Sequence, residues 1–134
     1  MRKGLLNRPR GKLRALIISP TRELSEQTHD SIRKLGKKTN LKSLTLYGGV
    51  SLIPQIKGIR EGAEIAVACP GRLLDLMNQK KVSLDFVEIV VLDEADHMFD
   101  MGFLPDIRKI LKALPRNRQT LLFSATMPIE VRGL

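Results

Sequence analysis

An alternation of short apolar runs with amphipathic stretches constrains the fold of this chain most strongly. The five runs are each five or six residues long: "RALIIS" (14–19), "SLTLY" (43–47), "EIAVAC" (64–69), "EIVVLD" (88–93) and "TLLFS" (120–124). Several of them are continuously apolar rather than alternating, which is typical of strands covered on both faces.

The stretches between the runs have helical spacing. Apolar side chains recur at intervals of three or four residues in 21–38, 51–61, 71–79 and 103–114. Thr21 has the side chain of an N-cap, and Pro128 marks the start of a further helix. With 134 residues, the chain suits a single domain. Strand–helix alternation of this kind predicts the α/β class, with a parallel sheet of about five strands and helices on both faces.

The charge is basic and unevenly distributed. The chain has 23 Lys and Arg against 14 Asp and Glu, a formal net charge of +9. The first fourteen residues contain no carboxylate and six cations, namely Arg2, Lys3, Arg8, Arg10, Lys12 and Arg14. Such an excess favours an anionic partner, most simply nucleic acid. From charge alone, a solvated and partly flexible basic end is an equally good interpretation.

Several classes of site are excluded. Cys69 is the single cysteine, so no internal disulfide can form, and one Cys with two distant His residues does not make an ordinary zinc site. No apolar run approaches the length of a membrane span. The charged N-terminus is not followed by the apolar stretch of a secretory signal. We expect a cytoplasmic protein with no membrane partner.

Ligands of parallel α/β sheets bind at the carboxyl ends of the strands, so the residues after each run are the candidate site. After the first run, "SPTREL" (19–24) offers the Thr21 hydroxyl, the free amides of a helix and the Arg22 guanidinium to a phosphate. In "YGGVS" (47–51), the adjacent glycines Gly48 and Gly49 would allow another backbone to approach closely. In "CPGRLLD" (69–75), the free amides at the start of a helix and the Arg72 guanidinium could again bind a phosphate. An ordinary cap or a tight turn is the simpler interpretation of each motif alone.

The fourth run ends in "DEAD", which places Asp93, Glu94 and Asp96 within four positions. One carboxylate can hold Mg²⁺ through water, and a second can take a proton from an attacking water, as phosphoryl transfer requires. The alternative is an acidic cluster at the start of a helix. After the fifth run, "SATMP" supplies Ser124 and Thr126, whose hydroxyls can bond a neighbouring carboxylate or cap a helix.

In this order, the motifs PTREL, GG, PGR, DEAD and SAT closely resemble the first RecA-like domain of the DEAD-box ATP-dependent RNA helicases. "LDEADHMFDMGF" (92–103) and "LLFSATMP" (121–128) extend the resemblance, which runs from residue 14 to the C-terminus. The resemblance implies a RecA-like, P-loop NTPase fold and a parent, expected to be of the bacterial type, that hydrolyses ATP with Mg²⁺ to bind RNA and open its duplexes.

The resemblance also implies roles for single residues. Asp93 would bind Mg²⁺ through water, and Glu94, beside the metal, would activate the hydrolytic water. Asp96 would bond Ser124 and Thr126 and so link ATP hydrolysis to strand separation. Sequence-independent contacts with the RNA backbone would come from Pro20, Thr21, Arg22, Gly48, Gly49, Gly71 and Arg72.

Two residues depart from the usual pattern of this family. Cys69 stands where the family usually has Thr, and a thiol is a weak hydrogen-bond donor, so one phosphate contact is weakened. Its simpler role is that of a small buried residue closing a strand. His97 follows the tetrad at a position where relatives vary, and we expect a partly exposed helix residue there.

The sequence contains no phosphate-binding loop of the form G-x-x-x-x-G-K-[ST]. Its two Gly-Lys pairs, at 11–12 and 36–37, lack the first glycine and the hydroxyl residue. The adenine-reading glutamine segment and the second RecA-like domain of the family do not occur either. We therefore expect a basic lead-in (1–13) and a partial RecA-like domain (14–134) that lacks the first strand and P-loop. "TLLFS" would then have an open apolar edge, and the basic lead-in would belong to the surface of the parent.

Three functional hypotheses follow. The first is a fragment of a DEAD-box helicase that is inactive alone and does not bind ATP or Mg²⁺ tightly. The second is a non-enzymatic module that binds the RNA backbone. The third is an unstable truncation with no function of its own.

Overall fold

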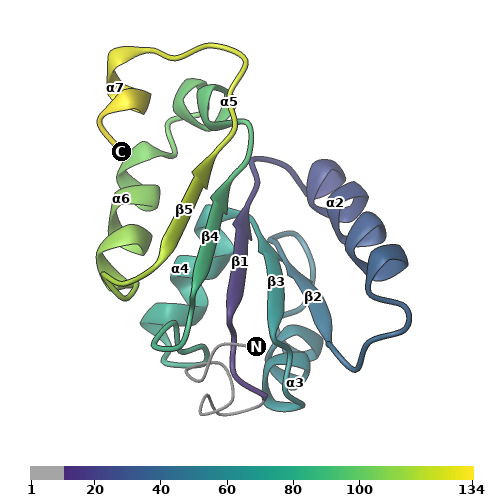
Figure 1. The fold of residues 1–134 in the computed structure, drawn as a ribbon. Helices are drawn as coiled ribbons and strands as arrows, with labels where there is room; N and C mark the ends of the chain where they lie inside the picture. Colours follow the sequence, from purple (N-terminus) through teal and green to yellow (C-terminus); the bar gives the residue numbers. More distant parts are fainter. Residues whose placement is uncertain (1–10) are drawn as a thin grey trace.

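The computed structural model describes residues 11–134, so most of the basic lead-in lies outside the described residues. The described chain forms a five-stranded sheet of order β2-β3-β1-β4-β5, in which every strand pair is parallel (Figure 1). In chain order, the elements are β1 (Ala15–Ile18), α2 (Arg22–Leu35), β2 (Ser43–Leu46), α3 (Ile53–Arg60), β3 (Ile65–Ala68), α4 (Pro70–Asn78), β4 (Ile89–Leu92), α5 (Ala95–Asp100), α6 (Leu104–Ala113), β5 (Gln119–Leu122) and α7 (Ile129–Arg132). Each strand overlaps its apolar run, and the predicted α/β class is confirmed.

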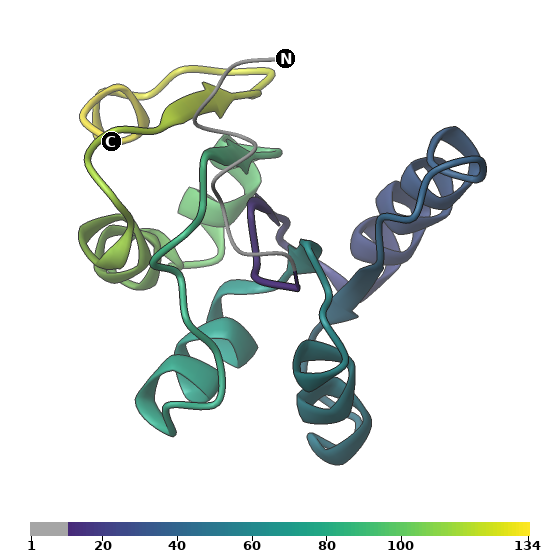
Figure 2. The same ribbon diagram turned by 60° about the horizontal axis from the view of Figure 1, so that its bottom comes forward.

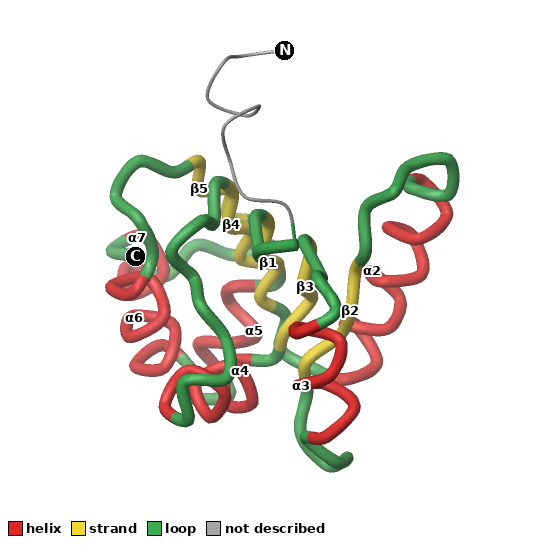
Figure 3. The backbone as a smooth tube through the Cα atoms, turned by 90° about the horizontal axis from the view of Figure 1, so that it is seen from below, coloured by secondary structure: helices red, strands yellow, loops and turns green. Residues whose placement is uncertain are grey.

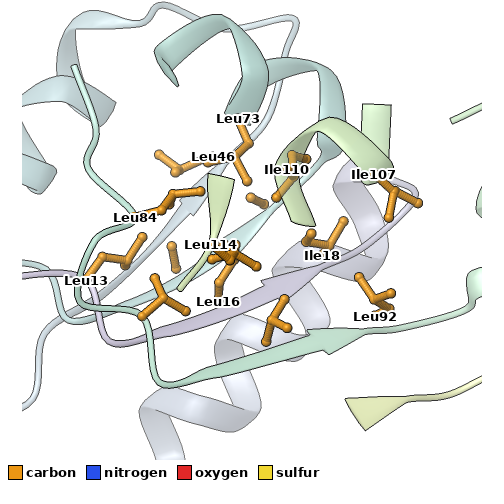
Figure 4. Packing of buried hydrophobic residues seen from close by; sticks show 14 of the residues in the cluster. Leu13, Leu16, Ile18, Leu46, Leu73, Leu84, Leu92, Ile107, Ile110 and Leu114 are labelled. Atoms are coloured by element: carbon orange, nitrogen blue, oxygen red, sulfur yellow. The ribbon is translucent and has the colours of Figure 1, made fainter. Parts of the chain in front are cut away.

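The main core lies on the face of the sheet that is covered by α4 and α6. Leu16 and Ile18 of β1 are completely buried there, because alternate side chains of a strand point to the same face. Leu73 of α4 and Ile110 of α6 pack against them, as Figure 4 shows at close range. The apolar faces of α4 and α6, which the helical spacing of their residues predicts, therefore pack against the sheet.

The opposite face is covered by α2 beside β2 and β3 (Figure 3). Two polar contacts join this helix to the sheet, which explains its buried polar residues. His29 Nε2 lies 2.9 Å from the hydroxyl oxygen of Ser43, and the Ser25 hydroxyl lies 3.5 Å from the sulfur of Cys69. Helices thus lie on both faces of the sheet. In Figure 2, α2 and α6 are seen on opposite sides of the strands.

Arg14, one of the six cations near the N-terminus, is held at the start of the sheet. Its Nε donates to Glu88 over 2.7 Å, and its Nη1 lies 3.4 Å from a carboxylate oxygen of Glu64. The hydrogen bond to Glu88 raises the pKa of Arg14, while partial burial opposes that rise. Arg14 therefore links the N-terminal ends of β1, β3 and β4 through these two carboxylates. Its charge is paired within the sheet and does not add to the basic lead-in.

Part of the α2 face carries no helix from residues 11–134. On β4 and β5, Ile89 is 37% exposed and Leu121 is 38% exposed, and Phe123 just beyond β5 is 55% exposed. We call these three residues the β4–β5 patch. Within the described residues, β5 is also the last strand on its side of the sheet. The predicted open apolar edge at 120–124 is present in this part of the chain. No helix of the described chain is long and apolar enough to cross a membrane.

We predict that Leu121→Lys reduces self-association of the chain, because a charge on an exposed edge strand opposes pairing between sheets. Sedimentation velocity at increasing protein concentration measures the effect. Leu35→Lys is the matched control, since Leu35 is 88% exposed at the end of α2 and lies outside the β4–β5 patch. Equal effects of the two substitutions would show that added charge, and not this patch, controls association.

Candidate functional site

The strand register brings the ends of all five strands to one edge of the sheet. Ile18 at the end of β1 is paired with both Ala68 and Leu92, and Leu46 and Leu122 are paired with these two in turn. The residues that follow therefore share the edge at which β1 passes into α2 and β4 into α5 (Figure 1). All five motifs selected from the sequence lie along this edge.

Asp93 leaves β4 at the centre of this edge. Its amide donates to the carbonyl of Ile18 over 2.9 Å, so the chain still follows the sheet at this point. Burial raises the pKa of the Asp93 carboxyl, and the nearby Glu94 carboxylate adds to the rise, while the backbone amide of Glu94 opposes it. A cation bound here would reverse that effect by favouring the ionised form.

Glu94 has a left-handed backbone, with φ of 50°. A non-glycine residue in this conformation is uncommon, and the surrounding structure must hold it there. The amide of Ala95, which follows, donates to the carbonyl of Phe123 over 3.0 Å and so fixes the turn. The Glu94 carboxylate is directed to the surface, where one oxygen lies 3.2 Å from Nδ1 of His97. An exposed carboxylate beside a half-buried one can orient a water molecule.

Asp96 joins α5 to the loop after β5. One oxygen of its carboxylate accepts hydrogen bonds from the amide and the hydroxyl of Thr126, each over 3.0 Å. Burial opposes ionisation of Asp96, but the bonds from Thr126, Ser124 and the amide of His97 outweigh it and hold its pKa below the ordinary value.

The Ser124 hydroxyl also contacts the backbone of Asp96. The Asp96 amide donates to the Ser124 hydroxyl oxygen over 3.0 Å, and that hydroxyl donates to the carbonyl of Thr126. Since Glu94 makes no capping bond for α5 with its own side chain, Ser124 supplies the cap from the loop after β5. The sequence alone did not distinguish a cap from a carboxylate contact, and the structure shows that Ser124 provides the cap.

Within residues 11–134, no three His, Cys, Asp or Glu side chains converge into a closed metal site. Asp93 and Glu94 supply two carboxylates at the open edge of the sheet. This donor set fits Mg²⁺, which keeps several waters and is bound through one or two carboxylates together with substrate phosphates. The carboxylates could hold such an ion only as part of a larger set that includes the phosphates.

Thr21 is the N-cap of α2, as predicted, because its hydroxyl oxygen accepts a hydrogen bond from the amide of Leu24 over 3.2 Å. Pro20 is buried and directs the chain from β1 into this helix. The Arg22 side chain is exposed and lies over the ring of Tyr47, with 5.1 Å from its Cζ to the ring centroid. The first motif therefore presents one oriented cation beside the end of β2.

The glycine motifs have open space around them. Cβ atoms built at Gly48, Gly49 and Gly71 would meet no other atom within 4 Å, so packing inside the protein does not require glycine there. Gly49 has φ of 81°, which favours glycine for conformational reasons. An open surface without side chains is what a bound backbone would need for close approach.

Arg72 is tied to the glycine loop. Its Nη2 donates to the carbonyl of Val50 over 3.0 Å, and its Nη1 donates to the side-chain oxygen of Gln55 over 3.1 Å. Sequence reasoning missed Gln55 and Tyr47. Tyr47 begins the YGG motif and Gln55 follows it in α3. Neither residue type indicates a functional site by itself, since glutamine is common on helices and tyrosine at strand ends.

Cys69 occupies the N-cap position of α4 without making a capping bond. Its thiol is half-buried against Ser25. Burial raises the pKa of the thiol, although its hydrogen bond with Ser25 opposes the rise. This placement agrees with a small residue closing a strand. His97 lies on the exposed side of α5, as expected of a helix residue at that position.

Comparison with known proteins identifies the family. The family model described as DEAD/DEAH box helicase matches residues 1–134. The chain belongs to the DEAD/DEAH box helicase family. It is 48% identical over 122 residues to the DEAD-box ATP-dependent RNA helicase CshA of Streptococcus pneumoniae, covering 91% of this chain and 23% of the relative. It is 45% identical over 126 residues to the RNA helicase CrhR of Synechocystis, covering 94% and 26%.

Solved structures agree with this family. A crystal structure of a DEAD box protein from the hyperthermophile Methanococcus jannaschii superposes with a TM-score of 0.88 at 45% identity, covering 91% of this chain and 33% of that one. A hypothetical ATP-dependent RNA helicase from Sulfolobus tokodaii gives a TM-score of 0.85 at 46% identity, covering 90% and 36%. The predicted RecA-like, DEAD-box fold is therefore confirmed.

The DEAD-box relatives are much longer than this chain, which spans about a quarter of the two described above and 17% of a third from rice, at 46% identity. Bacterial, archaeal and plant relatives match at similar identity, so the bacterial type stays a prediction.

We predict that Asp96→Ala releases the SAT loop of this DEAD-box chain from α5 while β5 stays paired with β4. The reason is that both hydrogen bonds from Thr126 end on one carboxylate oxygen. Hydrogen exchange followed by NMR should show faster exchange at the Thr126 amide and unchanged protection at Leu122. Asp106→Ala in α6 is the control, because it also removes a partly exposed carboxylate from the first turn of a helix. Unchanged exchange at Thr126 would contradict the assignment.

Proposed function

We propose that this chain is the part of a DEAD-box ATP-dependent RNA helicase that carries the hydrolytic carboxylates and half of an RNA track. The observation that carries the proposal is the convergence of five motifs at one edge of the sheet, with Asp96 and Thr126 bonded across it. In the intact parent, this edge would couple ATP hydrolysis to RNA binding and duplex opening.

On the nucleotide side, Asp93 would hold Mg²⁺ through water and Glu94 would take the proton of the attacking water. Two features support these roles. The pKa of Asp93 is raised by burial, so a cation would stabilise its ionised form, and Glu94 is fixed in a left-handed conformation that turns its carboxylate outward. Mg²⁺ supplies charge neutralisation at the phosphates when it is bound.

On the RNA side, Thr21, Arg22, Gly48, Gly49, Gly71 and Arg72 would contact the sugar–phosphate backbone, with Pro20 shaping the track from beneath. Arginines and helix amides suit phosphate oxygens, and such contacts carry no base information. The glycines leave the backbone open between the two arginines.

We further propose that residues 14–134 are part of the first RecA-like domain and that residues 1–13 are a basic lead-in. The P-loop strand and the second RecA-like domain would come from other parts of the parent. A cytoplasmic location fits this function.

We predict that Arg22→Ala combined with Arg72→Ala weakens binding of single-stranded RNA. Each arginine that contacts a phosphate adds about one unit to the slope of log K against log salt, so the slope should fall by about two. Fluorescence anisotropy over a range of KCl concentrations measures both effects. Arg108→Ala with Lys109→Ala removes the same charge from the exposed surface of α6. If both double variants behave alike, general basicity explains the binding.

We predict no RNA-stimulated ATP turnover by the 134-residue chain alone. Its carboxylates can place a metal and a water, but no G-x-x-x-x-G-K-[ST] loop in this sequence can cradle the phosphates. A phosphate-release assay with and without RNA tests this, and Glu94→Gln is the control for contaminating activity. Turnover that is abolished by Glu94→Gln would show that the chain is an enzyme on its own.

A second candidate function is a non-enzymatic module that binds the RNA backbone. The observation that favours it is the ordered pair Arg22 and Arg72, which needs no nucleotide to be in place. Salt-dependent RNA binding that is lost in the arginine double variant, without any turnover, would be its signature.

A further inference from the structure

Arg72 is held in position within the free chain. Two of the five N–H donors of its guanidinium are used, one by the Val50 carbonyl and one by Gln55. The side chain is half-buried, and its other donors stay available to a ligand. A long side chain with this many degrees of freedom adopts one position only if its neighbours fix it.

Gln55 is the neighbour that connects Arg72 to the sheet. It lies in α3 and is only 9% exposed, which is unusual for a glutamine on a surface helix. Its amide nitrogen donates to the carbonyl of Tyr47 over 3.0 Å, while its amide oxygen accepts from Arg72 over 3.1 Å. One amide group therefore joins the end of β2 to the start of α4.

The connection continues to the other arginine. The ring of Tyr47, whose carbonyl Gln55 holds, lies under the guanidinium of Arg22 at 5.1 Å. Arg22, Tyr47, Gln55 and Arg72 thus form a continuous series of contacts across three motifs that lie 50 residues apart from first to last. We call these four residues the arginine bridge.

We propose that Gln55 is a positioning residue that orders Arg72, and through Tyr47 the end of β2, for contact with RNA phosphates. This inference rests on the proposed RNA track. Gln55 is neutral and largely buried, so its contribution lies in ordering the cation before binding. Immobilising a free arginine during binding weakens affinity by about 2- to 10-fold, and the arginine bridge removes that loss.

The first experiment compares the full chain with Gln55→Met, which fills similar space without polar atoms. With a fluorescent single-stranded uridine oligonucleotide, anisotropy over several KCl concentrations should show affinity lower by about 2- to 10-fold. The salt slope should stay the same, because Gln55→Met removes no charge. Gln27→Met, at an exposed position of α2, is the matched control and should bind like the original chain.

The second experiment combines Gln55→Met with Arg72→Ala. If Gln55 acts through Arg72, the double variant should bind like Arg72→Ala alone. Multiplied losses in the double variant, or unchanged affinity in Gln55→Met while Arg72→Ala binds more weakly, would overturn the positioning role and leave the RNA track standing. Unchanged affinity in both Arg72→Ala and the Arg22 and Arg72 double variant would overturn the track, and the positioning role with it.

A third measurement uses the original chain without RNA and does not depend on the folding of any variant. Hindered rotation of a bonded guanidinium gives separate NMR signals for its Nη groups, whereas a free guanidinium gives averaged signals. We expect separate signals for Arg72 and averaged signals for Arg108, which is exposed on α6. Averaged signals for Arg72 would show that the arginine bridge is not formed in solution and would overturn the proposal.

Discussion

The parallel register of β1, β3 and β4 is the constraint on which the rest of the site depends. Ile18, Ala68 and Leu92 are register partners, so the chain leaves all three strands at one level. A shift of one residue in any strand would turn its buried side chains to the opposite face, and the completely buried Leu16, Ala66 and Val90 oppose such a shift. The core thereby sets where Thr21, Arg72 and Asp93 emerge.

Hydrogen bonds between motifs refine this placement. Asp96 holds the SAT loop, Ser124 caps α5 from the loop after β5, and Gln55 joins the glycine loop to α4. Each of these side chains bonds a backbone group or a side chain from a different strand–helix unit. The edge therefore behaves as one connected surface and not as five separate loops.

Much of this could be predicted from the sequence, because the strands are short apolar runs and the motifs follow them directly. Thr21 as a cap and Asp96 as the partner of Thr126 agree with the structure. The left-handed backbone of Glu94 could not be predicted, since such conformations are usually signalled by glycine or asparagine. Gln55 could not be predicted either, because its role depends on two contacts made across the fold, with Tyr47 and Arg72. The roles in catalysis and RNA binding stay predictions.

We propose that the PTREL, GG and PGR motifs at the carboxyl edge of the sheet form a single surface for RNA. The most direct test is an NMR titration of the ¹⁵N-labelled chain with single-stranded RNA. We predict that amide signals of Thr21, Arg22, Gly49, Gly71 and Arg72 shift together, with one common affinity. Signals of Arg108 and Lys109 on α6 should stay in place. Shifts centred on α6, or motif signals that move with unrelated affinities, would show that these motifs do not form one RNA surface.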